Sequence, residues 1–383
     1  MKPIHVCLVS DQTIPNILGI MHFKPEHILF ITTEEMKRKN KTEAILNTIK
    51  RAGIDPTFSE IVVKEDSPYD CQIKISQWIE STENDQFTVN LTCGTKIMSI
   101  SVFHIFRDYG SMMIYIPYPK NEFIQIYPIK KNVHPESISL RLGVVDYLTA
   151  YSLKVINEKK LEQKKEEAEK RKNLTKLIIE NYKELEALLK DLYSKLALYR
   201  TEKFYNFEFE YEFASDSIYQ EFFRQLGCEL KEDKISKKLT RREIQFLTGG
   251  WLEEYVFNCV NSLLDKEIND AVLGIEIENI AGSKNEFDVM FTKDNAIYFI
   301  ECKSLSPDKN LAQESLYKIG ALQKEFGLRV RSFFVTTSQK IMDENGQIRQ
   351  SIKARAEQFN TEIITYENIS NLEEILKQKL KIS

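Results

Sequence analysis

Short apolar runs alternate with longer amphipathic stretches over the N-terminal part of the chain. Runs that predict strands cover residues 4–10, 27–33, 58–63, 87–92 and 112–116. Residues 34–52 and 96–109 instead repeat their apolar positions with the spacing of a helix. Strands that alternate with helices are typical of a mainly parallel sheet, so we expect an α/β domain here.

Two polar loops follow predicted strands at the places where parallel sheets commonly bind ligands. Loop 1 is residues 10–16, with the sequence Ser10-Asp11-Gln12-Thr13-Ile14-Pro15-Asn16. Loop 2 is residues 90–96, with the sequence Asn90-Leu91-Thr92-Cys93-Gly94-Thr95-Lys96, and it runs into a predicted helix. Gly94, the Thr95 hydroxyl, the Lys96 ammonium and the free N–H groups of a helix N-terminus suit a phosphate oxygen. Alternatively, Thr95 only caps the helix and Lys96 is solvated.

Together these loops resemble the CARF domain, the Rossmann-like sensor of CRISPR-associated proteins. The resemblance implies a homodimer whose two pockets hold one cyclic oligoadenylate, most often cyclic tetra-adenylate. Cys93 stands where many relatives carry a second glycine. By this resemblance the ligand-binding residues are Ser10, Asp11, Gln12, Thr13, Asn16, Thr92, Gly94, Thr95 and Lys96.

The middle of the chain predicts a helical connector. Nearly every residue over 158–172 is charged, and leucines at helical spacing follow over 174–196, which predicts one long helix that is exposed first and packed later. Its leucine face could contact a second copy or pack against its own chain. Residues 207–213 alternate apolar and polar positions, which indicates a half-buried strand. A basic cluster follows that could track a phosphate backbone or form a solvated charged face: Lys231, Lys234, Lys237, Lys238, Arg241 and Arg242.

The C-terminal part predicts an α-β-β-β-α-β core. A helix begins near Gly249, with Glu253 beside its apolar stripe and Glu254 roughly opposite. Strand-like segments follow at 272–280, 286–291 and 296–303, then a helix at 311–326 and a strand at 330–336.

The second and third of these strands predict a hairpin that brings acidic side chains together. Asp294-Asn295 suits a two-residue turn, which would place Asp288 opposite Glu301 and Glu286 opposite Lys303 on one face. Facing carboxylates repel each other, so a cation should lie between them. Oxygen ligands without histidine or cysteine select Mg²⁺ or Mn²⁺, and a nearby ammonium can stabilise developing negative charge.

This arrangement resembles the PD-(D/E)XK (restriction-endonuclease-like) nuclease superfamily over about residues 240–337. The resemblance implies that Asp288, Glu301 and the Cys302 carbonyl bind the metal, with Glu253 as a further ligand or orienter. Lys303 would be the catalytic lysine. Gln313 and Tyr317, spaced like the Gln-x(3)-Tyr element of RecB-type members, would lie near the site. The alternative for the Glu301/Lys303 pair is a solvent-facing ion pair.

Composition and charge narrow the function further. The 383 residues carry a formal charge of −4, so a nucleic-acid contact needs a local basic patch. All five histidines precede residue 135, which removes imidazole from any site built of later residues. The six cysteines form no C-x-x-C pair, and no apolar run reaches the roughly 18 residues of a membrane span, so we expect a cytoplasmic protein without a membrane partner.

The sequence thus predicts a CARF-like domain at 1–150, a helical connector with an accessory strand at 151–235 and a PD-(D/E)XK nuclease domain at 236–383. Both ends of the chain resemble the ancillary CARF nucleases of type III CRISPR defence. We expect a cyclic oligoadenylate-activated, Mn²⁺- or Mg²⁺-dependent endonuclease acting on RNA, DNA or both. The alternatives are a catalytically inactive sensor that only binds nucleic acid or a partner, and an ordinary repair or restriction nuclease, which would leave the N-terminal loops unexplained.

Overall fold

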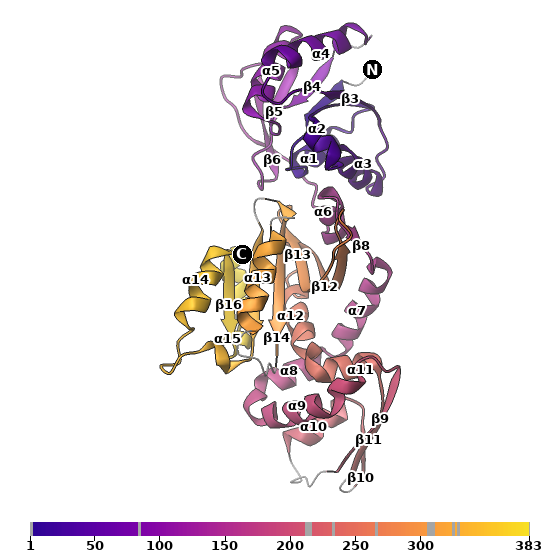
Figure 1. The fold of residues 1–383 in the computed structure, drawn as a ribbon, viewed down its shortest axis with the longest axis vertical. Coiled ribbons are helices and arrows are strands. Elements are labelled where there is room, and N and C mark those ends of the chain that lie inside the picture. Colours follow the sequence, from indigo (N-terminus) through magenta and orange to yellow (C-terminus); the bar gives the residue numbers. More distant parts are fainter. Residues whose placement is uncertain are drawn as a thin grey trace.

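The computed structural model describes residues 3–82, 86–210, 217–231, 234–264, 267–304, 311–323, 326–327 and 330–382, and within 311–323 it describes side chains only for 314–320. Its two main sheets are stacked along the long axis, with helix α6 (Val144–Ala150) between them (Figure 1). We call each sheet with its flanking helices the N-terminal domain and the C-terminal domain.

The N-terminal domain is a seven-stranded sheet in the order β3-β2-β1-β4-β5-β6-β7. Its strands are β1 (Ile4–Leu8), β2 (His27–Thr32), β3 (Thr57–Val62), β4 (Phe87–Asn90), β5 (Met112–Tyr115), β6 (Glu122–Tyr127) and β7 (Glu136–Ser137). Its helices are α1 (Ile14–Phe23), α2 (Glu34–Arg38), α3 (Lys41–Arg51), α4 (Pro68–Glu80) and α5 (Lys96–Asp108).

Strands β1 to β5 run parallel, as their alternation with helices predicts. Strand β6 pairs antiparallel with β5, and β7 pairs antiparallel with β6. The strand order changes direction between the neighbours β1 and β4. Loops 1 and 2 follow these two strands, so both lie at the topological switch point where α/β sheets bind ligands.

The prediction of a single helix over residues 34–52 is wrong. The chain forms α2 and α3 instead, because Asn40 between them adopts a left-handed backbone conformation with φ of 52°. Asparagine tolerates this region better than most residues. The break brings Lys39 and Lys41 toward Asp11 of loop 1.

The connector is a series of short helices and not one long helix. Its elements are β8 (Lys154–Val155), α7 (Glu158–Lys170), α8 (Lys172–Glu180), α9 (Tyr182–Leu196), β9 (Phe204–Glu210), α10 (Ile218–Gln225), β10 (Glu229–Lys231) and β11 (Lys234–Thr240). The helix ends at Arg171 and Asn181, both of which leave the helical conformation. Phe207 and Phe209 are buried on alternate positions of β9, which confirms the half-buried strand over its described part; Tyr211 and Phe213 lie outside the described residues.

The leucine face of the connector packs against its own chain. Leu185, Leu189 and Leu192 are fully buried in a core shared with α12 and with one face of the C-terminal sheet. These side chains are therefore not available for a contact with a second copy.

The C-terminal domain is a six-stranded sheet in the order β16-β15-β14-β13-β12-β8. Its elements after the connector are α11 (Arg241–Gln245), a π-helical turn (Phe246–Gly250), α12 (Trp251–Asn261), β12 (Ile268–Glu278), β13 (Lys284–Lys293), β14 (Ala296–Lys303), α13 (Leu311–Gln323), β15 (Arg331–Thr336), α14 (Gln350–Gln358), β16 (Thr361–Thr365), α15 (Tyr366–Ile369) and α16 (Leu372–Leu380). The predicted order of helix, three strands, helix and strand is confirmed.

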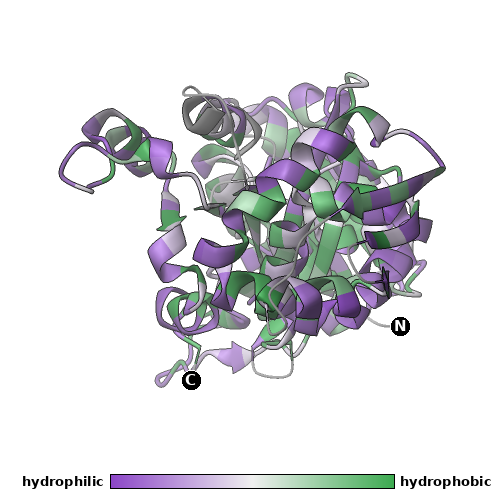
Figure 2. Cartoon of the chain, turned by 90° about the horizontal axis from the view of Figure 1, so that it is seen from below, coloured by the Kyte–Doolittle hydropathy of each residue, from purple (hydrophilic) through white to green (hydrophobic). Residues whose placement is uncertain are grey.

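The two domains share apolar side chains across α6. Tyr147 of this helix is fully buried in a core that contains residues of α1 and α3 on one side and Phe287 and Phe299 on the other. Seen from below, apolar residues concentrate in the central strands and polar residues in the outer helices (Figure 2). Among the described residues, no helix is both long and apolar enough to cross a membrane.

Candidate functional site

The predicted hairpin forms with the predicted register. Asp294 and Asn295 make the turn with φ of 51° and 56°, and regular pairing runs from Lys293 with Ala296 to Val289 with Ile300. Positive φ at both central residues is the signature of the turn type that Asp and Asn favour in hairpins. The sequence alone therefore predicts which residues of the two strands face each other.

Beyond Val289 and Ile300 the two strands separate. The regular pairing ends there, so neither expected pair, Asp288 with Glu301 or Glu286 with Lys303, belongs to the ladder. On its other side, β13 pairs Glu286 with Glu276 of β12. The Asp288 carboxylate takes over the role of the missing backbone partner and accepts a hydrogen bond from the Cys302 N–H at 2.7 Å.

The Asp288 and Glu301 carboxylates converge on the ammonium group of Lys303. Lys303 Nζ lies 2.7 Å from Glu301 Oε1 and 3.7 Å from Asp288 Oδ2, and it donates to the Cys302 carbonyl at 3.1 Å. The Glu301 side chain is only 4% exposed, so this is no solvent-facing ion pair. Two carboxylates and a carbonyl therefore surround one cationic position where the central strands β13 and β14 separate.

Glu253 and Glu254, which are neighbours on α12, lie in different environments. Glu254 was expected to point away from the interior, but it is buried and forms a bidentate ion pair with Arg171 because the connector helices cover that side of α12. Burial raises the pKa of Glu253 to about 7, with Glu286 and Glu301 adding to the shift and Lys303 opposing it. Glu253 is thus the α12 carboxylate that shares the electrostatic environment of the hairpin.

The pKa values of Asp288 and Lys303 shift in the directions expected where carboxylates are crowded around one ammonium group. Burial raises the pKa of Asp288, and the charges of Glu253 and Glu301 raise it further. Burial disfavours the charged form of Lys303, but Asp288 and Glu301 outweigh this effect and raise its pKa. The raised pKa of Asp288 shows that Lys303 does not fully offset the crowding of the carboxylates, so an additional cation would be favoured there.

The oxygen atoms at the end of the hairpin fit a hard divalent cation. Asp288, Glu301 and the Cys302 carbonyl offer oxygen ligands around the position that Lys303 Nζ approaches. Over the described ranges, no three His, Cys, Asp or Glu side chains are grouped closely enough to hold a metal, so Glu253 is not grouped with Asp288 and Glu301 in this geometry. Burial raises the pKa of the Cys302 thiol above its usual value, so the backbone carbonyl oxygen is the atom of Cys302 that could bind a metal.

Two lysines at the site were missed by the sequence analysis. Lys318 of α13 lies 3.4 Å from Glu301 Oε2 and donates to the Glu286 carbonyl at 2.9 Å. Lys164 of α7 donates to the Gly274 carbonyl at 2.6 Å and lies 3.9 Å from Glu286. Both belong to charged helix faces whose orientation depends on tertiary packing, so no local pattern marks them.

Tyr317 of the Gln-x(3)-Tyr element packs against Arg355 and not against the hairpin carboxylates. Tyr317 is 54% exposed and lies against Arg355, whose guanidinium is 4.0 Å from the ring centre. Its neighbour Lys318 faces Glu301 instead. Gln313 lies in α13, but its side chain is outside the described part of the chain.

Loop 1 divides into exposed and buried positions. Gln12 accepts a hydrogen bond from the Tyr151 hydroxyl at 2.9 Å, and Ser10 Oγ accepts from the Gln12 N–H at 3.2 Å. Thr13 and Asn16 are fully buried, with side chains that donate to the carbonyls of Ala150 and Leu8. These two residues support the loop and do not present polar atoms at its surface. Asp11 is exposed and pairs with Lys39 at 3.1 Å and Lys41 at 4.0 Å.

Loop 2 is ordered by its side chains. Thr92 Oγ1 donates to Asn90 at 2.5 Å and accepts the Ile116 N–H at 2.8 Å. Gly94 has φ of 80°, and a Cβ there would lie 3.1 Å from Leu8 Cβ, so the close approach to β1 needs glycine. Thr95 caps α5 through the Met98 N–H, and Lys96 is exposed without an ion pair to any residue that the structure describes.

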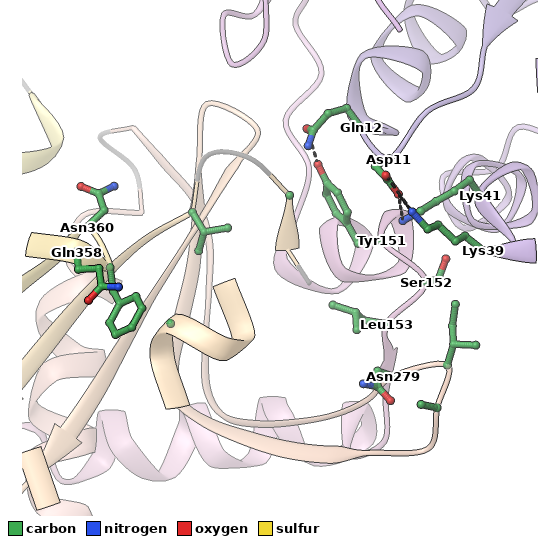
Figure 3. Close-up of a pocket in the computed structure, with 16 residues that line it drawn as sticks. Asp11, Gln12, Lys39, Lys41, Tyr151, Ser152, Leu153, Asn279, Gln358 and Asn360 are labelled. Carbon is green, nitrogen blue, oxygen red and sulfur yellow. Dashed lines mark hydrogen bonds and ion pairs between the residues drawn. The ribbon is translucent and has the colours of Figure 1, made fainter. Parts of the chain in front are cut away.

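A cavity of about 990 Å³ lies between loop 1, the start of the connector and the C-terminal domain. Figure 3 shows Gln12 bonded to Tyr151 at its upper wall, with Asp11, Lys39 and Lys41 beside them. Asn279 and Asn360 contribute from the opposite domain. The loop that carries Gln12 therefore lies next to a gap between the domains.

The basic cluster of the connector is largely neutralised within the chain. Lys234 pairs with Glu208 at 2.8 Å, Lys237 pairs with Glu243 at 2.7 Å, and Arg242 pairs with Glu167. These pairs favour a charged protein surface over a stripe that tracks a phosphate backbone.

Models of known protein families match both the N-terminal and the C-terminal part of the chain. Residues 4–147 match the family model of the Card1 CARF domain, and residues 240–382 match that of the Card1-like endonuclease domain. A search of curated protein sequences gives no significant match.

Solved structures share the fold at low sequence identity. Protein VC1899 from Vibrio cholerae is 19% identical, with a TM-score of 0.78 over 99% of this chain and 98% of that one. Can2 from Sulfobacillus thermosulfidooxidans, solved with cyclic tetra-adenylate, is 20% identical, with a TM-score of 0.73 over 97% and 96%. A type III CRISPR defence DNA nuclease activated by cyclic oligoadenylate is 15% identical, with a TM-score of 0.50 over 88% of this chain and 45% of that one. This chain belongs to the proteins that join a Card1-type CARF domain to a Card1-like endonuclease domain.

Proposed function

We propose that the protein is a cyclic oligoadenylate-activated, metal-dependent endonuclease of type III CRISPR defence, with its active site in the β13–β14 hairpin. The convergence of Asp288 and Glu301 on one buried cationic position supports this proposal. The match of residues 240–382 to an endonuclease family points to the same domain.

In phosphodiester hydrolysis, the residues of the hairpin would have separate roles. Asp288, Glu301 and the Cys302 carbonyl would hold Mg²⁺ or Mn²⁺, which when bound supplies positive charge to the scissile phosphate and the attacking water. Lys303 provides a fixed positive charge where negative charge develops on the phosphate. Glu253, with a pKa raised to about 7, can accept or donate a proton near neutral pH.

The activating ligand would bind at the switch point of the N-terminal sheet. Lys96 and the N-terminus of α5 would offer positive charge to the ligand from loop 2, which contacts Gln12 of loop 1 through Cys93. The fold similarity to Can2, which was solved with cyclic tetra-adenylate, supports this ligand.

A homodimer suits a ring-shaped ligand, because a two-fold axis lets two copies of the loops contact opposite sides of one ring. The first turns of the adjacent helices α4 and α5 expose apolar side chains next to loop 2. Tyr69 is 76% exposed and Ile100 is 69% exposed, with Ile73 and Ile97 beside them. We propose this patch, and not the leucine face of the connector, as a contact between copies.

A cleavage assay on defined RNA and DNA substrates tests the function. Each cyclic oligoadenylate is added in turn with Mn²⁺ or Mg²⁺, and cleavage is expected only with metal and the matching ring. Glu301→Gln and Lys303→Ala should each lower the stimulated rate by about 100-fold or more, since single electrostatic contacts in active sites contribute about that much.

Lys284→Ala is the matched control, because Lys284 is an exposed lysine of β13 and its loss changes the charge equally. It should cleave like the wild type. Messenger-dependent binding of nucleic acid without cleavage would favour the inactive sensor. Cleavage that persists in both site variants would contradict the assignment of the site.

A further inference from the structure

The turn of the β13–β14 hairpin is buried in the N-terminal domain. Hairpin turns usually lie on the surface, yet Asn295 is fully buried. It lies against the segment before β6 and the segment before α6, both of which belong to the N-terminal domain. The hairpin that carries Asp288 and Glu301 is therefore held at its tip by the other domain.

Hydrogen bonds saturate the Asn295 side chain. Its Nδ2 donates to Asn121 Oδ1 at 2.6 Å and to the Leu140 carbonyl at 2.9 Å, while its Oδ1 accepts from the Leu142 N–H at 2.6 Å. Asn121 in turn donates from Nδ2 to Asp294 Oδ1 at 3.2 Å. A buried amide with all of these partners holds one orientation, because any shift leaves polar groups unsatisfied.

Loop 2 connects to this contact through a short, bonded segment. Thr92 Oγ1 accepts from the Ile116 N–H at 2.8 Å, directly after β5. Residues 116–120 then form two tight turns, in which Tyr118 N–H donates to the Ile116 carbonyl and Lys120 N–H donates to the Pro117 carbonyl. Asn121 follows immediately. A displacement of Thr92 would therefore reach Asn121 without crossing a flexible linker.

From the turn, the backbone pairing of β13 and β14 leads to the carboxylates. Pairing is continuous from Lys293 and Ala296 at the turn to Val289 and Ile300, next to Asp288 and Glu301. Both strands are buried along this stretch, so the ladder moves as a unit. Movement of the tip changes how Asp288 approaches Cys302 and Glu301, where the strands have already separated.

We propose that Asn295 is a positioning residue through which the N-terminal domain sets the arrangement of the hairpin carboxylates when its ligand binds. This inference rests on the proposed function and adds its internal route. The coupling runs from Thr92 through residues 116–121 to the hairpin turn, and not through the connector helices.

Asn295→Gly tests this route, because glycine keeps the positive φ of the turn and removes only the side-chain bonds. In the full-length protein, the cleavage rate stimulated by cyclic tetra-adenylate should fall at least tenfold through kcat, with KM for nucleic acid and the affinity for the ring within about twofold of wild type. Asn121→Ala should act similarly, and the double variant should be no worse than either single change.

Asn40→Gly is the control, since Asn40 also has positive φ but is exposed and makes no capping bond. A purely structural role predicts that ring affinity, KM and thermal stability all worsen with the rate, which would overturn the inference. Additive losses in the double variant, or full stimulation of Asn295→Gly, would also overturn it. A wild-type protein that no cyclic oligoadenylate stimulates would instead contradict the proposed function.

Discussion

At the residue scale, burial and neighbouring carboxylates raise the pKa of Glu253 and of Asp288. The pKa of Glu253 rises to about 7, so the native state binds a proton that the unfolded state releases near pH 4.5. The free energy of unfolding of the metal-free protein should therefore decrease as pH rises from about 4.5 to about 7, and activity should increase as pH rises through 7. Glu253→Gln should flatten this part of the stability curve, measured by denaturant titration at pH 5 and pH 8; curves identical to wild type would contradict the pKa assignment.

At the element scale, α12 places two neighbouring glutamates in separate roles. Glu254 and Arg171 form a buried ion pair that joins α12 to the connector, and removing one partner leaves a buried charge. Glu254→Ala should lower the free energy of unfolding by about 3 kcal/mol while leaving the cleavage rate per folded molecule unchanged. Glu221→Ala, which breaks an exposed pair with Arg224, should change the free energy of unfolding much less, because solvent screens that pair. Equal effects of the two variants in urea titrations would contradict this account of α12.

At the scale of the whole molecule, the exposed patch on α4 and α5 should control self-association. A Tyr69→Glu, Ile100→Glu double variant should sediment as a monomer and lose stimulated cleavage, because charge at an apolar contact opposes its burial. The wild type should bind one cyclic tetra-adenylate per two chains in calorimetry. Leu198→Glu is the control, since Leu198 is 86% exposed in the connector, remote from the loops. A dimer that survives the double variant would contradict the patch as the interface.

Local patterns predict those parts of the fold that depend on neighbours in sequence. The hairpin register follows from Asp294-Asn295, since a two-residue turn sets the pairing of the two strands as far as Val289 and Ile300. The parallel sheet follows from alternating strands and helices, and the switch point then places loops 1 and 2 together. These features are confirmed because short-range geometry decides them.

Predictions that depended on which surface a helix would meet were less successful. The connector was predicted as one helix, but breaks at Arg171 and Asn181 let its leucines cover the C-terminal core. Glu254 was expected to face outward, because its burial by α7 and α8 involves residues remote in sequence. Lys318, which contacts Glu301, had no local signal at all.

The sequence by itself determined the element order, the pairing of the hairpin and the candidate carboxylates, because dihedral preferences and side-chain alternation act between close neighbours. Only the tertiary structure decided that the hairpin turn lies inside the N-terminal domain and that Lys318 and Lys164 join the site. Such contacts arise when distant segments pack together, and their energy depends on shape and burial that no short stretch of sequence contains.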